Sequence, residues 1–168
     1  MKLSQTLLPE FDQEMATTRK LLERVPDGRA GWKPHDKSMS LGRLATHVAE
    51  LAGWGPTILG QESLDIDPPG GGGYQPRTLE SGREIVELFD ANVPKTRAAV
   101  ESAEDAELMQ PWTLLKGGQV IFKLPRIAVL RTMLFSHVIH HRGQLSVYLR
   151  LNDVPVPSIY GPSADEGF

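Results

Sequence analysis

A pair of histidines, His137 and His141, has the spacing in this sequence that best suits metal binding. The surrounding stretch, residues 133–144, carries apolar residues at three- and four-residue steps, a pattern typical of a helix. Side chains four residues apart project from the same helical face, roughly 6 Å from each other along the axis. Two imidazoles in this arrangement can share one divalent ion.

The helical face that carries this pair is otherwise apolar. The stripe comprises Leu130, Met133, Leu134, His137, His141, Leu145 and Tyr148. We therefore expect both imidazoles to point into the core, where an unpaired ring nitrogen costs about 1–3 kcal/mol. A metal ion removes that cost. Two core histidines without a metal remain the alternative, because pairs at this spacing also arise by chance.

His47 supplies a third imidazole from a separate predicted helix. That helix is capped by Ser40, carries Leu44, Val48 and Leu51 on its apolar face, and is predicted to run to about residue 60. Three protein ligands leave at least one open position, which is typical of catalytic sites. Zinc, nickel, iron, manganese and copper all accept three imidazoles, and among them we expect zinc or nickel.

Four polar residues near these histidines in the sequence are candidates for supporting positions: Glu50, His140, Arg142 and Gln144. Glu50 follows His47 by three residues and can be a further ligand, a hydrogen-bond acceptor or a general base; the alternative is a solvated surface glutamate. His140 lies about 100° around the helix from its neighbour and is expected to face solvent or a partner. Arg142 and Gln144 can orient the chain's tail or a substrate, or make ordinary surface contacts.

Four helical stretches are predicted to position these residues. They begin near Leu3, at Ser40, at Thr78 and at Pro125, and Pro94 is expected to kink or break the third. The glycine-rich residues 61–77 are predicted to form a long crossover loop without helix or strand. Gly117-Gly118 indicates a short β-hairpin before the last helix. We therefore predict an all-α helix bundle, with residues 1–168 as one domain and an extended tail from Asn152.

Composition excludes several classes of site. The chain has no cysteine, so thiolate ligands and disulfides are excluded. A net charge of -3 without a basic helix disfavours binding to nucleic acid or to an anionic membrane surface. No signal peptide and no apolar run of roughly 20 residues is found, so we expect a cytoplasmic protein.

Several segments resemble the DinB family of damage-inducible helical-bundle proteins. They are residues 44–50 (LATHVAE), 136–145 (SHVIHHRGQL), 148–150 (YLR) and 156–165 (VPSIYGPSAD). The resemblance implies a four-helix bundle with up-down-down-up connectivity, often dimeric. It also implies a metal site of three histidines, at His47, His137 and His141.

Two functions follow as hypotheses. The first is a metal-dependent enzyme, a thiol S-transferase or a hydrolase, that activates a low-molecular-weight thiol or water for reaction with a small electrophilic substrate. The absence of cysteine means that any thiol comes from another molecule. The alternative is a non-catalytic, metal-binding stress-response protein that acts through homodimerisation.

Overall fold

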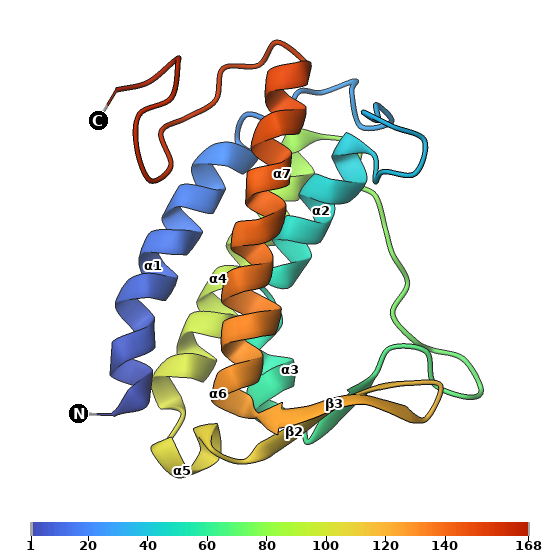
Figure 1. Ribbon diagram of the computed structural model, residues 1–168, viewed down its shortest axis with the longest axis vertical. Helices are drawn as coiled ribbons and strands as arrows, with labels where there is room; N and C mark the ends of the chain where they lie inside the picture. The colour runs from blue at the N-terminus through green and yellow to red at the C-terminus, as the bar shows by residue number, and fades with distance from the viewer. Residues whose placement is uncertain (1, 168) are drawn as a thin grey trace.

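The protein is rich in helices and carries one small sheet. The computed structural model describes residues 2–167 (Figure 1). The helices are α1 (Leu3–Leu22), α2 (Leu41–Leu51), α3 (Gly55–Gly60), α4 (Gly82–Ser102), α5 (Asp105–Leu108), α6 (Arg126–Val129) and α7 (His137–Leu151), with a π-helical segment η1 (Leu130–Ser136) before α7. The strands are β1 (Ser63–Asp65), β2 (Pro111–Lys116) and β3 (Gln119–Pro125).

The core lies between the long helices. Helices α1 and α2 each pack against both α4 and α7. In Figure 1, α1 and α7 run towards the top of the view, whereas α2 and α4 run towards the bottom. The buried side chains between them include Phe11, Leu44, Phe89, Leu134 and Leu145. Removing such apolar surface from water is the main contribution that holds the helices together.

The first two predicted helices begin where the sequence indicates. Helix α1 buries the predicted positions Leu7, Phe11 and Met15. Ser40 caps α2, since its side chain accepts a hydrogen bond from the backbone N–H of Arg43 at 3.2 Å. These local signals therefore predict both helix starts correctly.

The predicted helix from Ser40 to about residue 60 is wrong in its length. Helix α2 ends at Leu51, and a turn leads into the separate helix α3. Pro56 lies in the first turn of α3, where its missing N–H costs nothing, whereas the interior of one long helix would lose a hydrogen bond there. Helix α2 therefore ends one helical turn after His47.

The third predicted helix begins later than Thr78. Ser81 caps α4 and forms a reciprocal capping box with Glu84, so the first helical residue is Gly82. Pro94 lies inside a continuous helix, and the alternative of a break is therefore excluded.

The crossover loop contains a strand, contrary to the prediction that it holds none. Strand β1 pairs in parallel with β2, with Leu64 opposite Leu114. The predicted hairpin is confirmed: β2 and β3 are antiparallel, and Gly117 and Gly118 both have the positive φ that the tight turn requires. A strand of three residues has little signal of its own and forms because the hairpin offers it an edge.

The last predicted helix is interrupted. Helix α6 passes into η1, where backbone N–H groups bond five residues back, before α7 begins at His137. Such a widened turn displaces the following side chains around the axis relative to an uninterrupted α-helix. Val138 and Leu149 are fully buried, whereas His137 is half-buried. His137 thus lies at the margin of the buried face, whereas His141 is buried.

The tail after α7 is extended, as predicted, and is fixed to the helices. Asp165 accepts a hydrogen bond from the backbone N–H of Val156 and pairs with Arg150. Among the described residues, no helix combines the length and apolar character needed to cross a membrane.

Candidate metal centre

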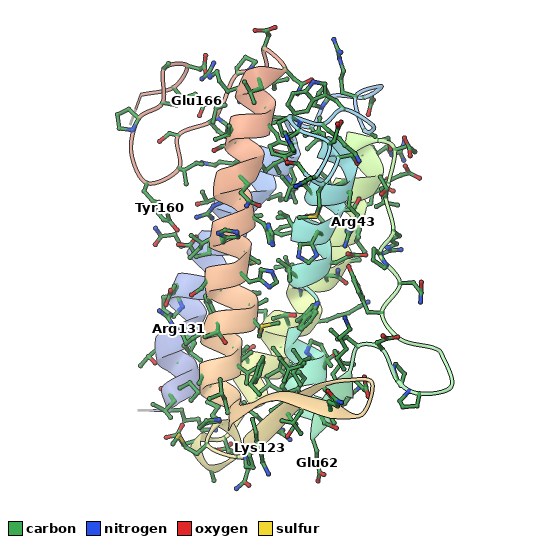
Figure 2. The ribbon with its side chains drawn as sticks, turned by 45° about the vertical axis from the view of Figure 1, so that its right-hand side comes forward. Arg43, Glu62, Lys123, Arg131, Tyr160 and Glu166 are labelled. Atoms are coloured by element: carbon green, nitrogen blue, oxygen red, sulfur yellow. The ribbon has the colours of Figure 1, made fainter. Side chains whose placement is uncertain are left out.

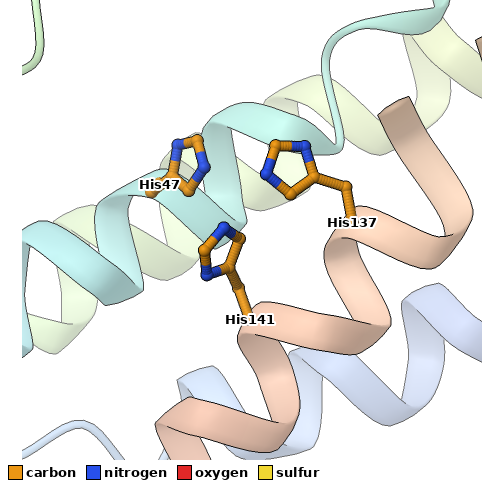
Figure 3. Close-up of side chains that lie close together, drawn as sticks. All are labelled: His47, His137 and His141. Atoms are coloured by element: carbon orange, nitrogen blue, oxygen red, sulfur yellow. The ribbon is translucent and has the colours of Figure 1, made fainter. Parts of the chain in front are cut away.

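Three histidines from two helices come together in the space between α2 and α7 (Figure 3). One ring nitrogen of each of His47, His137 and His141 lies within 4.8 Å of the other two. The ring centroid of His47 is 5.2 Å from that of His137 and 4.7 Å from that of His141, and the last two are 4.8 Å apart. In Figure 3 each ring turns one nitrogen towards the shared space.

The packing of α2 and α7 sets this geometry. Leu44, Val48 and Leu51 are buried, which fixes the rotation of α2 and directs the side chain of His47 towards α7. One helical turn separates His137 from His141 on α7, so the two rings lie one above the other. The backbone therefore brings the three imidazoles close before any ligand binds.

Burial keeps the three imidazoles neutral. It lowers the pKa of His47 to about 3, and the neighbouring rings of His141 and His137 contribute to the fall. Burial is also the largest cause of the lowered pKa of His137 and of His141. A neutral imidazole has a free lone pair, which is the form that binds a metal ion.

The hydrogen bonds of the rings fit a metal site. Nδ1 of His141 lies 2.7 Å from the amide oxygen Oε1 of Gln144, an arrangement in which Nδ1–H donates and Nε2 presents its lone pair. Nδ1 of His47 and Nδ1 of His137 are buried and have no hydrogen-bond partner within residues 2–167. The two unpartnered nitrogens and the free Nε2 of His141 are donors of the kind that zinc, copper, iron and nickel accept from imidazole.

The four candidates for supporting positions differ in how close they lie to the three histidines. Gln144 hydrogen-bonds to the ring of His141 and so adjoins the site. Glu50 lies beside it, with Oε2 3.9 Å from Nδ1 of His47. His140 is exposed, with its ring centroid 4.9 Å from that of His141.

Arg142 points away from the histidines. Its buried guanidinium pairs with Glu14 at 2.6 Å and donates to the hydroxyls of Thr18 and Tyr160. These partners lie on α1 and in the tail, so we correct the placement of Arg142 beside the metal site. The physical reason is its position on α7, where it faces α1 rather than α2. Its contact with Tyr160 agrees with the other role considered for it, which is to orient the tail.

Residues around Glu50 were not identified from the sequence. Arg43, Tyr74 and Arg77 all hydrogen-bond to its carboxylate. Arg43 precedes His47 by one helical turn, a spacing that could have indicated a neighbour of the site. Tyr74 and Arg77 come from the crossover loop, where no periodic pattern predicts which side chains meet a helix.

Comparison with known protein families identifies the family of this sequence. The sequence model that describes the DinB superfamily matches residues 10–145, which include all three histidines. The chain belongs to the DinB superfamily.

Relatives of this DinB-superfamily protein include proteins from two Bacillus species. An uncharacterized protein, YrdA, from Bacillus subtilis (strain 168) is 26% identical over 162 residues, which cover 95% of this chain and 89% of the relative. A crystal structure of a DinB-like protein from Bacillus cereus ATCC 10987 superposes with a TM-score of 0.69 at 21% identity, covering 91% of this chain and 95% of the other.

A second crystal structure supports the same fold. The DinB-like protein YjoA from Bacillus subtilis gives a TM-score of 0.68 at 20% identity, covering 92% of this chain and 97% of the other. At these identities the solved structures indicate a shared DinB-like fold, while an activity has to be argued from the site itself.

Replacing Gln144 with leucine is expected to weaken zinc binding by about 10- to 100-fold. The amide oxygen that fixes the ring orientation of His141 is lost, and supporting hydrogen bonds of this kind typically contribute that much to affinity. Competition against a fluorescent zinc chelator measures the affinity. Gln13→Leu, at an exposed position on α1, is the matched control. An affinity unchanged in both variants would contradict a supporting role for Gln144.

The metal-free DinB-superfamily protein is expected to lose stability as the pH falls below about 6.5. The unfolded chain takes up protons on histidine near that pH, whereas folded His47 has a pKa of about 3. Between these values the unfolded state binds more protons, so stability decreases with falling pH and this contribution ends near pH 3.

Urea unfolding in the presence of a chelator measures that loss between pH 7 and pH 4.5. The loss is expected to be smaller in His47→Leu than in the wild type. His35→Leu, in an exposed loop, is expected to behave like the wild type. Equal pH dependence in all three proteins would be inconsistent with a buried, neutral His47.

Proposed function

We propose that this protein binds one divalent metal ion, zinc or nickel, through His47, His137 and His141. We further propose that it activates a low-molecular-weight thiol, or water, for attack on a small electrophilic substrate. The single observation that carries the proposal is the convergence of three neutral, half-buried or buried imidazoles, one nitrogen of each lying within 4.8 Å of the other two.

The residues of the site have different roles in the proposed function. His47, His137 and His141 donate lone pairs, and Gln144 holds the ring of His141 in one orientation. The side chain of His47 retains 15% of its exposure, so the site is screened from bulk water and still reachable by a small molecule. When bound, a divalent ion supplies Lewis acidity at an open coordination position, which favours the deprotonated form of a thiol or water ligand.

The proposed architecture is an up-down-down-up four-helix bundle, formed by α1, α2, α4 and α7 as one domain. The directions of these helices in Figure 1 support it. We propose a cytoplasmic location as well, in keeping with a site that takes a small thiol from its surroundings.

Thiol transfer tests the catalytic part of the proposal. Zinc-loaded and nickel-loaded protein are incubated with cysteine or 2-mercaptoethanol and with 1-chloro-2,4-dinitrobenzene, and the thioether product is followed by absorbance. We expect a metal-dependent rate that is lost in His137→Ala and retained in His140→Ala. Equal rates for the wild type, His137→Ala and chelator-treated protein would reject metal-dependent thiol transfer.

A non-catalytic metal-binding protein that acts through dimerisation is the second candidate. Val147 and Leu151, on α7, are each 56% exposed, and exposed apolar residues on one helix face favour a contact with a second copy. Light scattering during size-exclusion chromatography measures the mass. A dimer that dissociates in Val147→Lys, together with an inactive metal-loaded protein, would favour this candidate.

A further inference from the structure

A cluster of four polar side chains adjoins the histidine site. We call it the Glu50 cluster and define it as Arg43, Glu50, Tyr74 and Arg77. Arg43 donates to the Glu50 carboxylate at 3.2 Å and to the Tyr74 hydroxyl at 2.5 Å, and Tyr74 donates to Glu50 at 2.7 Å. Arg77 donates to Glu50 at 3.2 Å. Figure 2 shows Arg43 on α2, on the side that faces the crossover loop.

The cluster lies next to the metal ligands. Arg43, His47 and Glu50 occupy one face of α2, because they are separated by four and three residues. Oε2 of Glu50 is 3.9 Å from Nδ1 of His47. Burial is the main cause of the lowered pKa of His47 and of His141, and the charge of Arg43 contributes to both shifts, as expected for a cation close to both rings.

The cluster carries an excess positive charge. Two guanidinium groups share the single carboxylate of Glu50, while burial and the Glu50 carboxylate raise the pKa of Tyr74 and keep its hydroxyl neutral. The described hydrogen bonds of Arg43 use two of the several N–H donors of its guanidinium. Its side chain retains 15% of its exposure, so the remaining donors are within reach of a small molecule.

Space for a ligand lies on the loop side of the cluster. A hollow of about 330 Å³ is lined by residues of α3, β1 and the glycine-rich loop, including Trp54, Gly73 and Tyr74. The three histidines are not part of its lining. Tyr74 therefore links the two, because it lines this hollow and accepts a hydrogen bond from Arg43.

We propose that Arg43 binds the carboxylate of the small molecule that reacts at the histidine site, so that this site selects thiols or substrates that carry a carboxylate. The inference rests on the proposed function and names its substrate class. The planar guanidinium already donates a hydrogen bond to one carboxylate, that of Glu50, and charged pairs of this kind are stronger than neutral hydrogen bonds. Arg77 remains on Glu50 and holds it in place.

Two thiols of similar size test this selectivity. Titration calorimetry measures the binding of 3-mercaptopropionate and of its neutral counterpart 3-mercapto-1-propanol to zinc-loaded protein. We expect the carboxylate-bearing thiol to bind at least about tenfold more tightly to the wild type and to Arg83→Gln, an exposed arginine variant on α4. In Arg43→Gln the ratio is expected to fall to near one, with affinity for the neutral thiol changed by no more than about twofold.

The outcomes separate this inference from a purely structural role. A wild-type ratio near one, or a tenfold ratio that persists in Arg43→Gln, overturns it. So does an Arg43→Gln variant that loses affinity for both thiols equally, because that result indicates that Arg43 only holds the loop.

A second experiment distinguishes failure of the carboxylate site from failure of the proposed function. Metal-free protein is titrated with propionate and with 1-propanol while the Nε–H signal of Arg43 is followed by nuclear magnetic resonance. We expect a saturable shift with propionate alone, whether or not zinc binds. Zinc binding without this shift and without thiol selectivity rejects the carboxylate site and leaves the metal site standing. A shift in a protein that binds no metal rejects the proposed function instead.

Discussion

The free energy of unfolding of an Arg142→Met variant is expected to be about 3–5 kcal/mol lower than that of the wild type. Arg142 is 1% exposed, and its partner Glu14 is nearly as buried, with 7% of its side chain exposed. Removing the guanidinium leaves the Glu14 carboxylate in the core without its charged partner. Thr18 and Tyr160 also lose a hydrogen bond each. Urea unfolding followed by circular dichroism measures the change.

Two further variants separate the charge from the packing. Glu14→Met combined with Arg142→Met is expected to recover most of the loss, because no uncompensated charge is then buried. The ion pair of Arg83 with Glu87 is exposed, so Arg83→Met is expected to leave the free energy of unfolding close to that of the wild type. A loss of similar size in the single and the double variant would show that packing, rather than the buried charge, dominates.

Zinc is expected to raise the free energy of unfolding of the wild type by about 4 kcal/mol when its free concentration is about a thousandfold above the dissociation constant. Only the folded state brings His47, His137 and His141 together, so binding favours that state. For a chain of this length the increase corresponds to roughly 10 °C in melting temperature.

The comparison is made within each variant, with and without zinc, so that any effect of the substitution on folding cancels. His141→Ala is expected to lose the zinc-dependent increase, and His140→Ala to retain it. An increase of the same size in His141→Ala would mean that zinc stabilises the protein at another place.

The parts of the fold that the sequence predicted correctly depend on local signals. The apolar period of residues 3–22 and the cap at Ser40 act within one or two helical turns, and both helix starts follow from them. The grouping of the three histidines was also predicted. Two of them share one helix face, and the third lies among apolar residues that have to pack against a neighbouring helix.

The parts that were not predicted depend on contacts distant in the sequence or on backbone detail. The π-helical segment η1 changes the hydrogen-bond spacing without a change in composition, so an ordinary helix was expected there. Glu14 and Arg142 are separated by 128 residues, and Tyr74 reaches Glu50 from a loop without periodicity. Such pairs form only after the helices have packed, and one sequence contains no pattern that selects them.

The measurement that tests the central claim most directly is the number of metal ions bound per chain. Protein purified without a nickel-bearing affinity step is analysed by elemental mass spectrometry before and after addition of zinc or nickel, followed by desalting. We predict close to one ion per chain in the wild type and in His140→Ala, and nearly none in His47→Ala, His137→Ala and His141→Ala. A wild type that binds no zinc or nickel, or histidine variants that bind as much as the wild type, would contradict the metal site.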